Sequence, residues 1–156
     1  MTDIRFYHLT RTPLEHALPD LLTKTLDKGW RAVVRTSSPE RCEALTQALW
    51  TARPDSFLPH GNRQDGEAAR QPIWLTDQDD NPNGATVLFL TDGASLADAT
   101  GYNLICDLFD GRDPEAVQAA RARWKERQTA GHSLTYWRQE ERGWQEVKSE
   151  QGKDTA

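Results

Sequence analysis

Two cations one helical turn apart, Arg121 and Lys125, are the side chains of this sequence best suited to binding a ligand. Residues four apart share one face of a helix, and Trp124 lies beside the two cations toward the border of the core. This combination predicts a site for a short acidic peptide ending in an aromatic residue, because the cations would bind its carboxylates and the indole its ring. A solvated basic stripe is the alternative. The residues on this side of the helix are Val117, Arg121, Trp124, Lys125 and Gln128.

Catalytic chemistry has weaker support in the sequence. His60 could act as a general base, but a histidine in such a loop more often hydrogen-bonds to the backbone and fixes the turn. Ser95 lies in Gly93-Ala94-Ser95-Leu96-Ala97, which lacks the second glycine of a nucleophile elbow, so a helix cap suits it better. We therefore expect no catalytic residues; the alternative is a small α/β enzyme that uses His60 or Ser95 with Asp98.

Metal and nucleotide sites are not predicted either. The four histidines do not have the sequence spacing of metal ligands, and the two cysteines lie far from each other in the sequence. The sequence therefore offers no set of ligands for zinc. The segment Asp77–Gly84 opens like a calcium loop, but Pro82 replaces the glycine of the sharp turn. The turn Leu9–Pro13 has no glycine that would let a backbone approach a pyrophosphate. We expect no cofactor and no metal.

Composition narrows the classes of partner. The chain has 156 residues, a net charge of -5 and a pI of about 5.4, so an anionic partner must meet a local basic patch. Cys42 and Cys106 lie in apolar-patterned segments and are expected to be buried thiols. There is no signal-peptide pattern and no apolar run near the about 18 residues of a membrane span, so a cytoplasmic protein without a membrane partner is expected.

Strand-like and helix-like segments alternate along the chain. This order predicts an α/β fold: a single Rossmann-like domain with a mostly parallel central sheet flanked by helices and no nucleotide-binding glycine motif. The expected strands are Ile4–Leu9, Trp30–Thr36, Pro72–Thr76, Ala85–Thr91 and Tyr102–Phe109. The expected helices run from Thr12 to Gly29, from Ser37 or Ser38 to Trp50, over Ser95–Thr100, and from Asp113 to Gly131.

Several local features are expected within this plan. Thr12 should cap the first helix together with Glu15, and Pro19 should kink or delay it. The segment Gly61–Gln71 is expected to be a surface loop.

The end of the chain allows two arrangements. Residues Leu134–Trp137 and Trp144–Val147 could form a hairpin or an extended tail packed on the domain. The domain is expected to span residues 1–147, with residues 148–156 as a disordered tail that has no apolar anchor.

Aromatic and apolar residues also gather between Ala48 and Gly61. Trp50 points away from the core stripe of its helix and is followed by Phe57, Leu58 and Pro59. These residues could close the edge of the core or form an apolar contact surface for another protein.

The run from Leu49-Trp50 to Ser56–His60 resembles the signature of the chi subunit of bacterial DNA polymerase III holoenzyme. Phe6-Tyr7 and Arg121–Tyr136 support the resemblance, which covers about Ile4 to Trp144. It implies a Rossmann-like domain without nucleotide chemistry and an accessory subunit without an active site.

The resemblance also implies two partners. One is the acidic C-terminal tail of single-stranded-DNA-binding protein, whose basic and aromatic contacts fall on Arg121, Trp124 and Lys125. A further apolar contact of the family falls on Asp110, a departure that shifts the pocket edge to Phe109. The other partner is the psi subunit of the clamp loader, or the clamp loader directly. Its contacts are assigned to Trp50, Phe57, Leu58 and Pro59.

A direct single-stranded nucleic-acid binder remains a second alternative. It would use Arg121, Arg123, Lys125 and Arg127, but these spread around the helix instead of forming one stripe. We expect no sequence-specific contact with nucleic acid and a monomer in the absence of partners.

Overall fold

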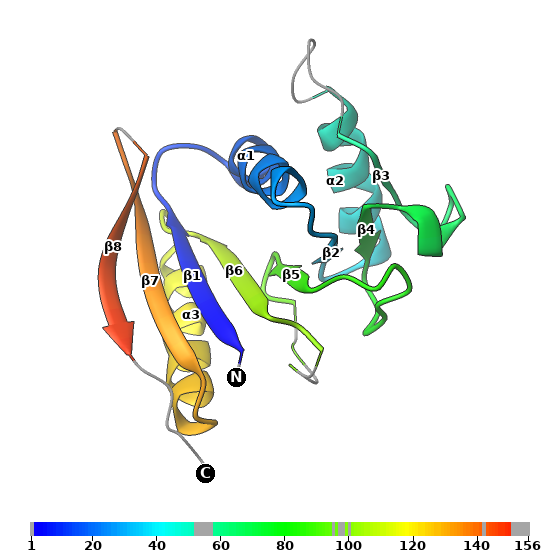
Figure 1. Cartoon of the computed structure of the whole chain (residues 1–156). Coiled ribbons are helices and arrows are strands. Elements are labelled where there is room, and N and C mark those ends of the chain that lie inside the picture. Colours follow the sequence, from blue (N-terminus) through cyan, green and yellow to red (C-terminus); the bar gives the residue numbers. More distant parts are fainter. Residues whose placement is uncertain are drawn as a thin grey trace.

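The described residues form one sheet of eight strands in the order β3-β4-β2-β5-β6-β1-β7-β8 (Figure 1). They are residues 2–51, 58–94, 96, 99, 101–141 and 143–150 of a computed structural model. Neighbouring strands are parallel except β7 and β8, which form an antiparallel hairpin. The strands are β1 (Asp3–Leu9), β2 (Ala32–Arg35), β3 (His60–Gly61), β4 (Ile73–Thr76), β5 (Val87–Leu90), β6 (Leu104–Asp110), β7 (Ser133–Glu140) and β8 (Gly143–Glu150).

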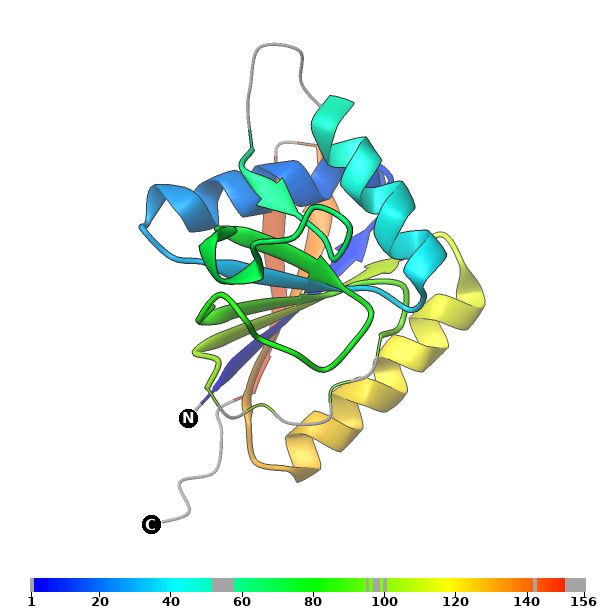
Figure 2. The same cartoon turned by 90° about the vertical axis from the view of Figure 1, so that its right-hand side faces the viewer.

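Helices cover both faces of this sheet, as predicted for an α/β fold. Helices α1 and α2 lie on one face and α3 lies on the other (Figure 2). The helices are α1 (Leu14–Asp27), α2 (Pro39–Thr51) and α3 (Pro114–Thr129), with a short 3-10 turn at Ala68–Arg70.

Alternate side chains of β1 serve two separate cores. Phe6 packs with Trp124 on the α3 side, whereas Tyr7 lies in the cluster under α1 and α2. The separation follows from the two-residue period of a strand. Since β6 and β7 flank β1, all three strands present alternate residues to α3.

The start of α1 differs from its prediction. Pro13 is the N-cap residue and no side chain caps the helix, because the Thr12 hydroxyl accepts a hydrogen bond from Gln139 Nε2 at 2.7 Å instead. Pro19 lies inside the helix and does not delay it. Its missing N–H falls in the second turn, and the buried face around Leu18 and Leu22 holds the helix on the sheet.

The hairpin alternative for the end of the chain is confirmed. β7 adds to β1 in parallel, and β8 pairs with β7 through an irregularity between Tyr136 and Trp137. β8 includes residues 148–150, three more than the predicted domain end, while residues 151–156 lie outside the described part. The predicted loop Gly61–Gln71 begins with β3, and most of the predicted helix Ser95–Thr100 lies outside the described residues.

Gln139 joins this hairpin to the turn between β1 and α1. Its side-chain oxygen accepts hydrogen bonds from the backbone N–H groups of Thr10, Arg11 and Thr12, at 3.3, 2.9 and 3.1 Å. One amide therefore satisfies three backbone donors of the turn that precedes α1.

Candidate functional site

A buried ion pair fixes α3 on the sheet. Asp107 of β6 accepts two hydrogen bonds from Arg123, at 2.7 and 3.0 Å, and its side chain is 2% exposed. Arg127, one turn further, is also buried, and its charge acts on Asp107. Two of the four cations of the nucleic-acid alternative therefore face inward and do not form part of an open basic stripe.

The remaining predicted site residues divide between the surface and the core. Arg121, Lys125 and Gln128 are exposed on the outer side of α3, and Val117 is half-buried. Trp124 is buried, with its ring 5.4 Å from that of Phe6. It thus supports the surface from below and does not form an open wall.

An aromatic cluster lies where α3, β1, β6 and β7 meet. The ring of Tyr136 is 6.0 Å from those of Trp124 and Phe109, and the ring of His8 is 5.1 Å from Phe109. The Tyr136 hydroxyl and His8 Nδ1 share a hydrogen bond of 2.5 Å. Phe109, the expected edge of the pocket, is buried in this cluster beside Asp110.

Two arginines from different elements act on this cluster. Arg121 of α3 and Arg138 of β7 are exposed, and within the described residues neither has a carboxylate partner. Burial lowers the pKa of His8, and both arginines lower it further. The pKa of Tyr136 is raised by burial and lowered in part by the same two charges. The surface thus combines positive charge that has no carboxylate partner with the aromatic cluster beside it.

Sequence reasoning missed His8, Tyr136 and Arg138 as members of this surface. Alternate residues of β7 face α3. Predicting a strand over this whole segment would therefore have placed Tyr136 and Arg138 on the same face of the sheet. The partner strand was the missing information, because β1 lies more than a hundred residues earlier.

The second predicted surface is only partly exposed. Trp50 is 43% exposed and its ring packs on His60, with 4.1 Å between centroids. Leu58, which was assigned to the partner contact, is buried in the core because it packs with the α1 and α2 cluster. Pro59 is half-buried, and Phe57 lies outside the described residues.

The residues considered for catalysis have structural roles where they are described. His60 is buried, with Nδ1 2.6 Å from the Leu58 carbonyl and Nε2 3.1 Å from that of Thr46, which confirms its role in fixing the turn. Ser95 and Asp98 lie outside the described residues.

Both cysteines are buried free thiols, as predicted, and burial raises the pKa of Cys42 to about 11 and that of Cys106 to about 12.

The calcium-like turn is built from internal hydrogen bonds. Asp79 pairs with buried Arg35 at 2.9 Å, while Asn81 and Asn83 bond to backbone carbonyls. Within the described residues, no three side chains of the metal-binding types come together.

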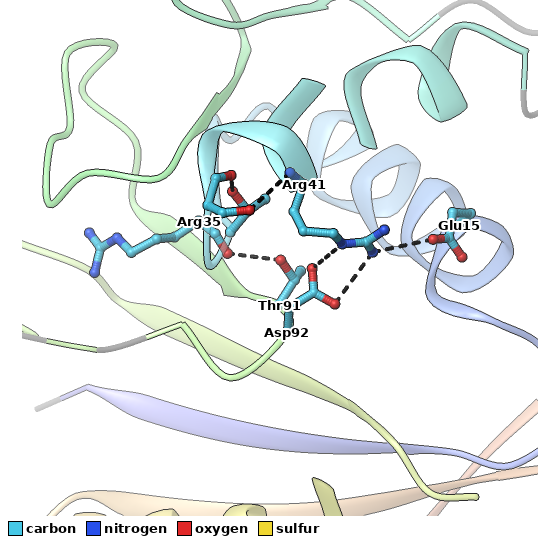
Figure 3. A network of polar contacts seen from close by, with 7 residues as sticks. Glu15, Arg35, Arg41, Thr91 and Asp92 are labelled. Carbon is cyan, nitrogen blue, oxygen red and sulfur yellow. Dashed lines mark hydrogen bonds and ion pairs between the residues drawn. The ribbon is translucent and has the colours of Figure 1, made fainter. Parts of the chain in front are cut away.

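Charged side chains occupy the carboxyl ends of the strands, where open α/β sheets bind ligands. Figure 3 shows Arg41 between Asp92, at 2.8 Å, and Glu15, at 3.3 Å. The crevice beside this network has a volume of about 610 Å³, and Asp110 and Asp113 also line it. Because carboxylates outnumber the arginines in this crevice, it disfavours a phosphate group.

Comparison with known proteins shows the family of the chain. The family model described as DNA polymerase III chi subunit, HolC, matches residues 1–135. The chain belongs to this family. A probable DNA polymerase III subunit chi of Rickettsia prowazekii (strain Madrid E) is 32% identical over 97 residues, which are 62% of this chain and 59% of that relative. The DNA polymerase III subunit chi of Escherichia coli (strain K12) is 23% identical over 122 residues, 78% of this chain and 82% of that protein.

The family membership confirms the resemblance to the chi subunit of DNA polymerase III. The chain spans about three fifths of the Rickettsia relative, so the match there is partial. No described helix is both long and apolar enough to cross a membrane.

Proposed function

We propose that the protein is a non-catalytic adaptor that binds the acidic C-terminal tail of single-stranded-DNA-binding protein and holds it near the clamp loader. The surface that carries this proposal consists of Arg121, Lys125, Arg138, Tyr136 and His8. It would bind tail carboxylates with its cations and pack the terminal aromatic residue beside Tyr136.

The local charge of this surface is the main support. The whole chain has a net charge of -5, yet Arg121 and Arg138 have no carboxylate partner among the described residues. An unpaired arginine close to a second one is electrostatically unfavourable until an anion is bound. The acidic remainder of the surface would at the same time repel long polyanions, which favours a short acidic peptide over a nucleic-acid strand.

The Trp50 side is proposed as the contact with psi or directly with the clamp loader. Trp50 lies on α2, which covers the face of the sheet opposite to α3. Both partners could therefore bind at once. Exposed tryptophans are common anchors of protein interfaces. Of the four residues assigned to this contact, Trp50 is the most exposed one that the structure describes.

The first test is a titration with a fluorescent peptide copying the tail of the host's single-stranded-DNA-binding protein. A control peptide lacks the terminal aromatic residue and should bind much more weakly. Arg121→Ala and Lys125→Ala should each weaken binding about tenfold, since a charge-assisted contact contributes about 1.5–3 kcal/mol. Arg63→Ala, an exposed cation near β3, is the matched control.

If both variants bind the tail as wild type does, the site assignment is wrong. If the wild-type protein does not bind the tail at low salt, the tail-binding function itself is wrong. The second contact is tested with the purified clamp-loader complex: Trp50→Ala should weaken that binding and leave tail binding intact.

A further inference from the structure

The His8 imidazole is held at both of its edges. Its Nδ1 shares a hydrogen bond with the Tyr136 hydroxyl, and its opposite edge lies against the backbone of Gly111. A Cβ on Gly111 would come within 2.0 Å of His8 Nε2, so only glycine permits this approach. The ring therefore has a fixed orientation between the end of β6 and β7.

The two contacts determine which nitrogen carries the proton in the neutral ring. The Nε2 edge of the ring faces the Gly111 backbone, and this contact raises the pKa of His8, from which we infer that the neutral ring carries its hydrogen on Nε2. A neutral imidazole has one N–H, so Nδ1 is then an acceptor. In that state the Tyr136 hydroxyl donates to Nδ1, and its hydrogen points toward the ring.

Protonation of His8 reverses the direction of this hydrogen bond. Nδ1 gains a hydrogen and donates it to the Tyr136 oxygen. The hydroxyl hydrogen must then turn away from the ring and becomes available to an acceptor bound at the surface. Arg121 and Arg138 oppose this protonation in the free protein, because their charges disfavour the imidazolium.

We propose that His8 and Tyr136 form a proton-controlled hydrogen-bond donor for a carboxylate of the bound peptide. His8 is a positioning residue here, and Tyr136 contacts the carboxylate. The inference rests on the proposed function, since it assigns roles within the same site. A bound carboxylate offsets the two arginine charges, allows His8 to protonate and receives the hydroxyl hydrogen.

The charged and titratable groups that face His8 determine whether the affinity for the peptide rises or falls with pH. They are Arg138 and Tyr136 from β7, Arg121 from α3 and Asp110 from the end of β6. Burial lowers the pKa of free His8 and the two arginines lower it further, whereas a ligand carboxylate favours its cation. Binding therefore takes up a proton, and affinity rises as the pH falls from 8 toward 5.5.

The test measures the affinity for the tail peptide between pH 5.5 and 8 at constant ionic strength. Wild type should bind more tightly at pH 5.5 than at pH 8, by at most about tenfold for each unit by which binding raises the His8 pKa. His8→Gln keeps a hydrogen-bonding side chain but does not titrate, so its affinity should be nearly independent of pH. Tyr136→Phe should weaken binding at pH 5.5 more than at pH 8.

Two controls separate this role from a structural one. His132→Gln removes another partly buried imidazole and should keep the wild-type pH dependence. Calorimetry in buffers with different ionisation enthalpies should show proton uptake by wild type and none by His8→Gln. Thermal melting establishes that each variant is folded.

The outcomes are distinct. If His8→Gln retains the wild-type pH dependence, or if wild type shows no pH dependence, this inference is wrong while the proposed function stands. If wild type does not bind the tail at any pH, the proposed function fails and the inference fails with it.

Discussion

The two faces of the sheet at β1 and β7 differ in how their charges are balanced. On the α3 face, the charges of Arg121 and Arg138 act on Tyr136, and neither arginine has a carboxylate partner among the described residues. On the α1 face, a groove of about 410 Å³ has an aromatic lining that includes Tyr7, Trp137 and Trp144.

Cations also line the groove on the α1 face, but anions accompany them. Arg5, Lys24 and Lys28 contribute positive charge, whereas Asp27 lies among them and Asp3 acts on Arg5. Glu146 is paired in register with Trp137 on the same side. Both faces have aromatic side chains, so uncompensated charge is the feature that distinguishes the face we propose for an acidic peptide.

The largest expected effect concerns the support of the α3 face. Asp107→Ala would leave the largely buried Arg123 without its carboxylate partner, which should lower the free energy of unfolding by about 3–5 kcal/mol. Urea denaturation measures this change. Glu126→Ala removes a carboxylate that is 74% exposed and should change stability very little. Equal stability of the two variants would show that the buried pair does not hold α3.

The next effect tests the charge contrast directly. The double variant Arg121→Ala/Arg138→Ala should weaken tail binding about a hundredfold, because two charge-assisted contacts are lost. The matched double variant Arg5→Ala/Lys28→Ala removes as much positive charge from the α1 face and should leave affinity unchanged. If the second pair weakens binding as much as the first, the peptide binds in the aromatic groove.

A smaller effect is expected at the joint between the hairpin and α1. Gln139→Ala leaves three backbone N–H groups and the Thr12 hydroxyl without their partner, which should lower stability by about 1–3 kcal/mol. Differential scanning calorimetry measures the change. An unchanged melting temperature would mean that water replaces the amide at no cost.

The smallest effect is a pH dependence of folding. Burial lowers the pKa of His8 and of His132 in the folded protein, so the unfolded chain binds protons more readily. Stability should therefore decrease as the pH falls below about 6.5, the usual pKa of histidine, and level off below the lowered values. Urea denaturation at pH 7.5, 6.5 and 5.5 measures this. A stability that rises on acidification would contradict it.

Most of the fold could be predicted because local sequence patterns indicate where each helix and strand lies. The short apolar runs of β2, β4, β5 and β6 and the start signal at Asp113 follow from periodicity and turn chemistry. The hairpin remained ambiguous, since β7 is stabilised by pairing with β1, which no local pattern reveals.

The candidate site was only partly predictable for a related reason. Helical spacing placed Arg121 and Lys125 outside and Trp124 at the core border, as the structure has them. It did not predict that Arg123 would be largely buried, because an arginine paired with Asp107 replaces the apolar residue expected on an inner face. Tyr136, His8 and Arg138 required knowledge of which strands are neighbours.

The central position of β1 has a consequence for how the protein is made. β1 pairs with β6 and β7, which end at Asp110 and Glu140, so the first strand synthesised has no partner until most of the chain exists. At about 5–20 residues per second, the ribosome needs several seconds to deliver those partners. During that interval Ile4, Phe6 and Tyr7 are available to other binders of nascent chains. The β1 segment therefore stays unpaired on the ribosome until β6 and then β7 have emerged, so this part of the sheet closes only after Glu140 has been made.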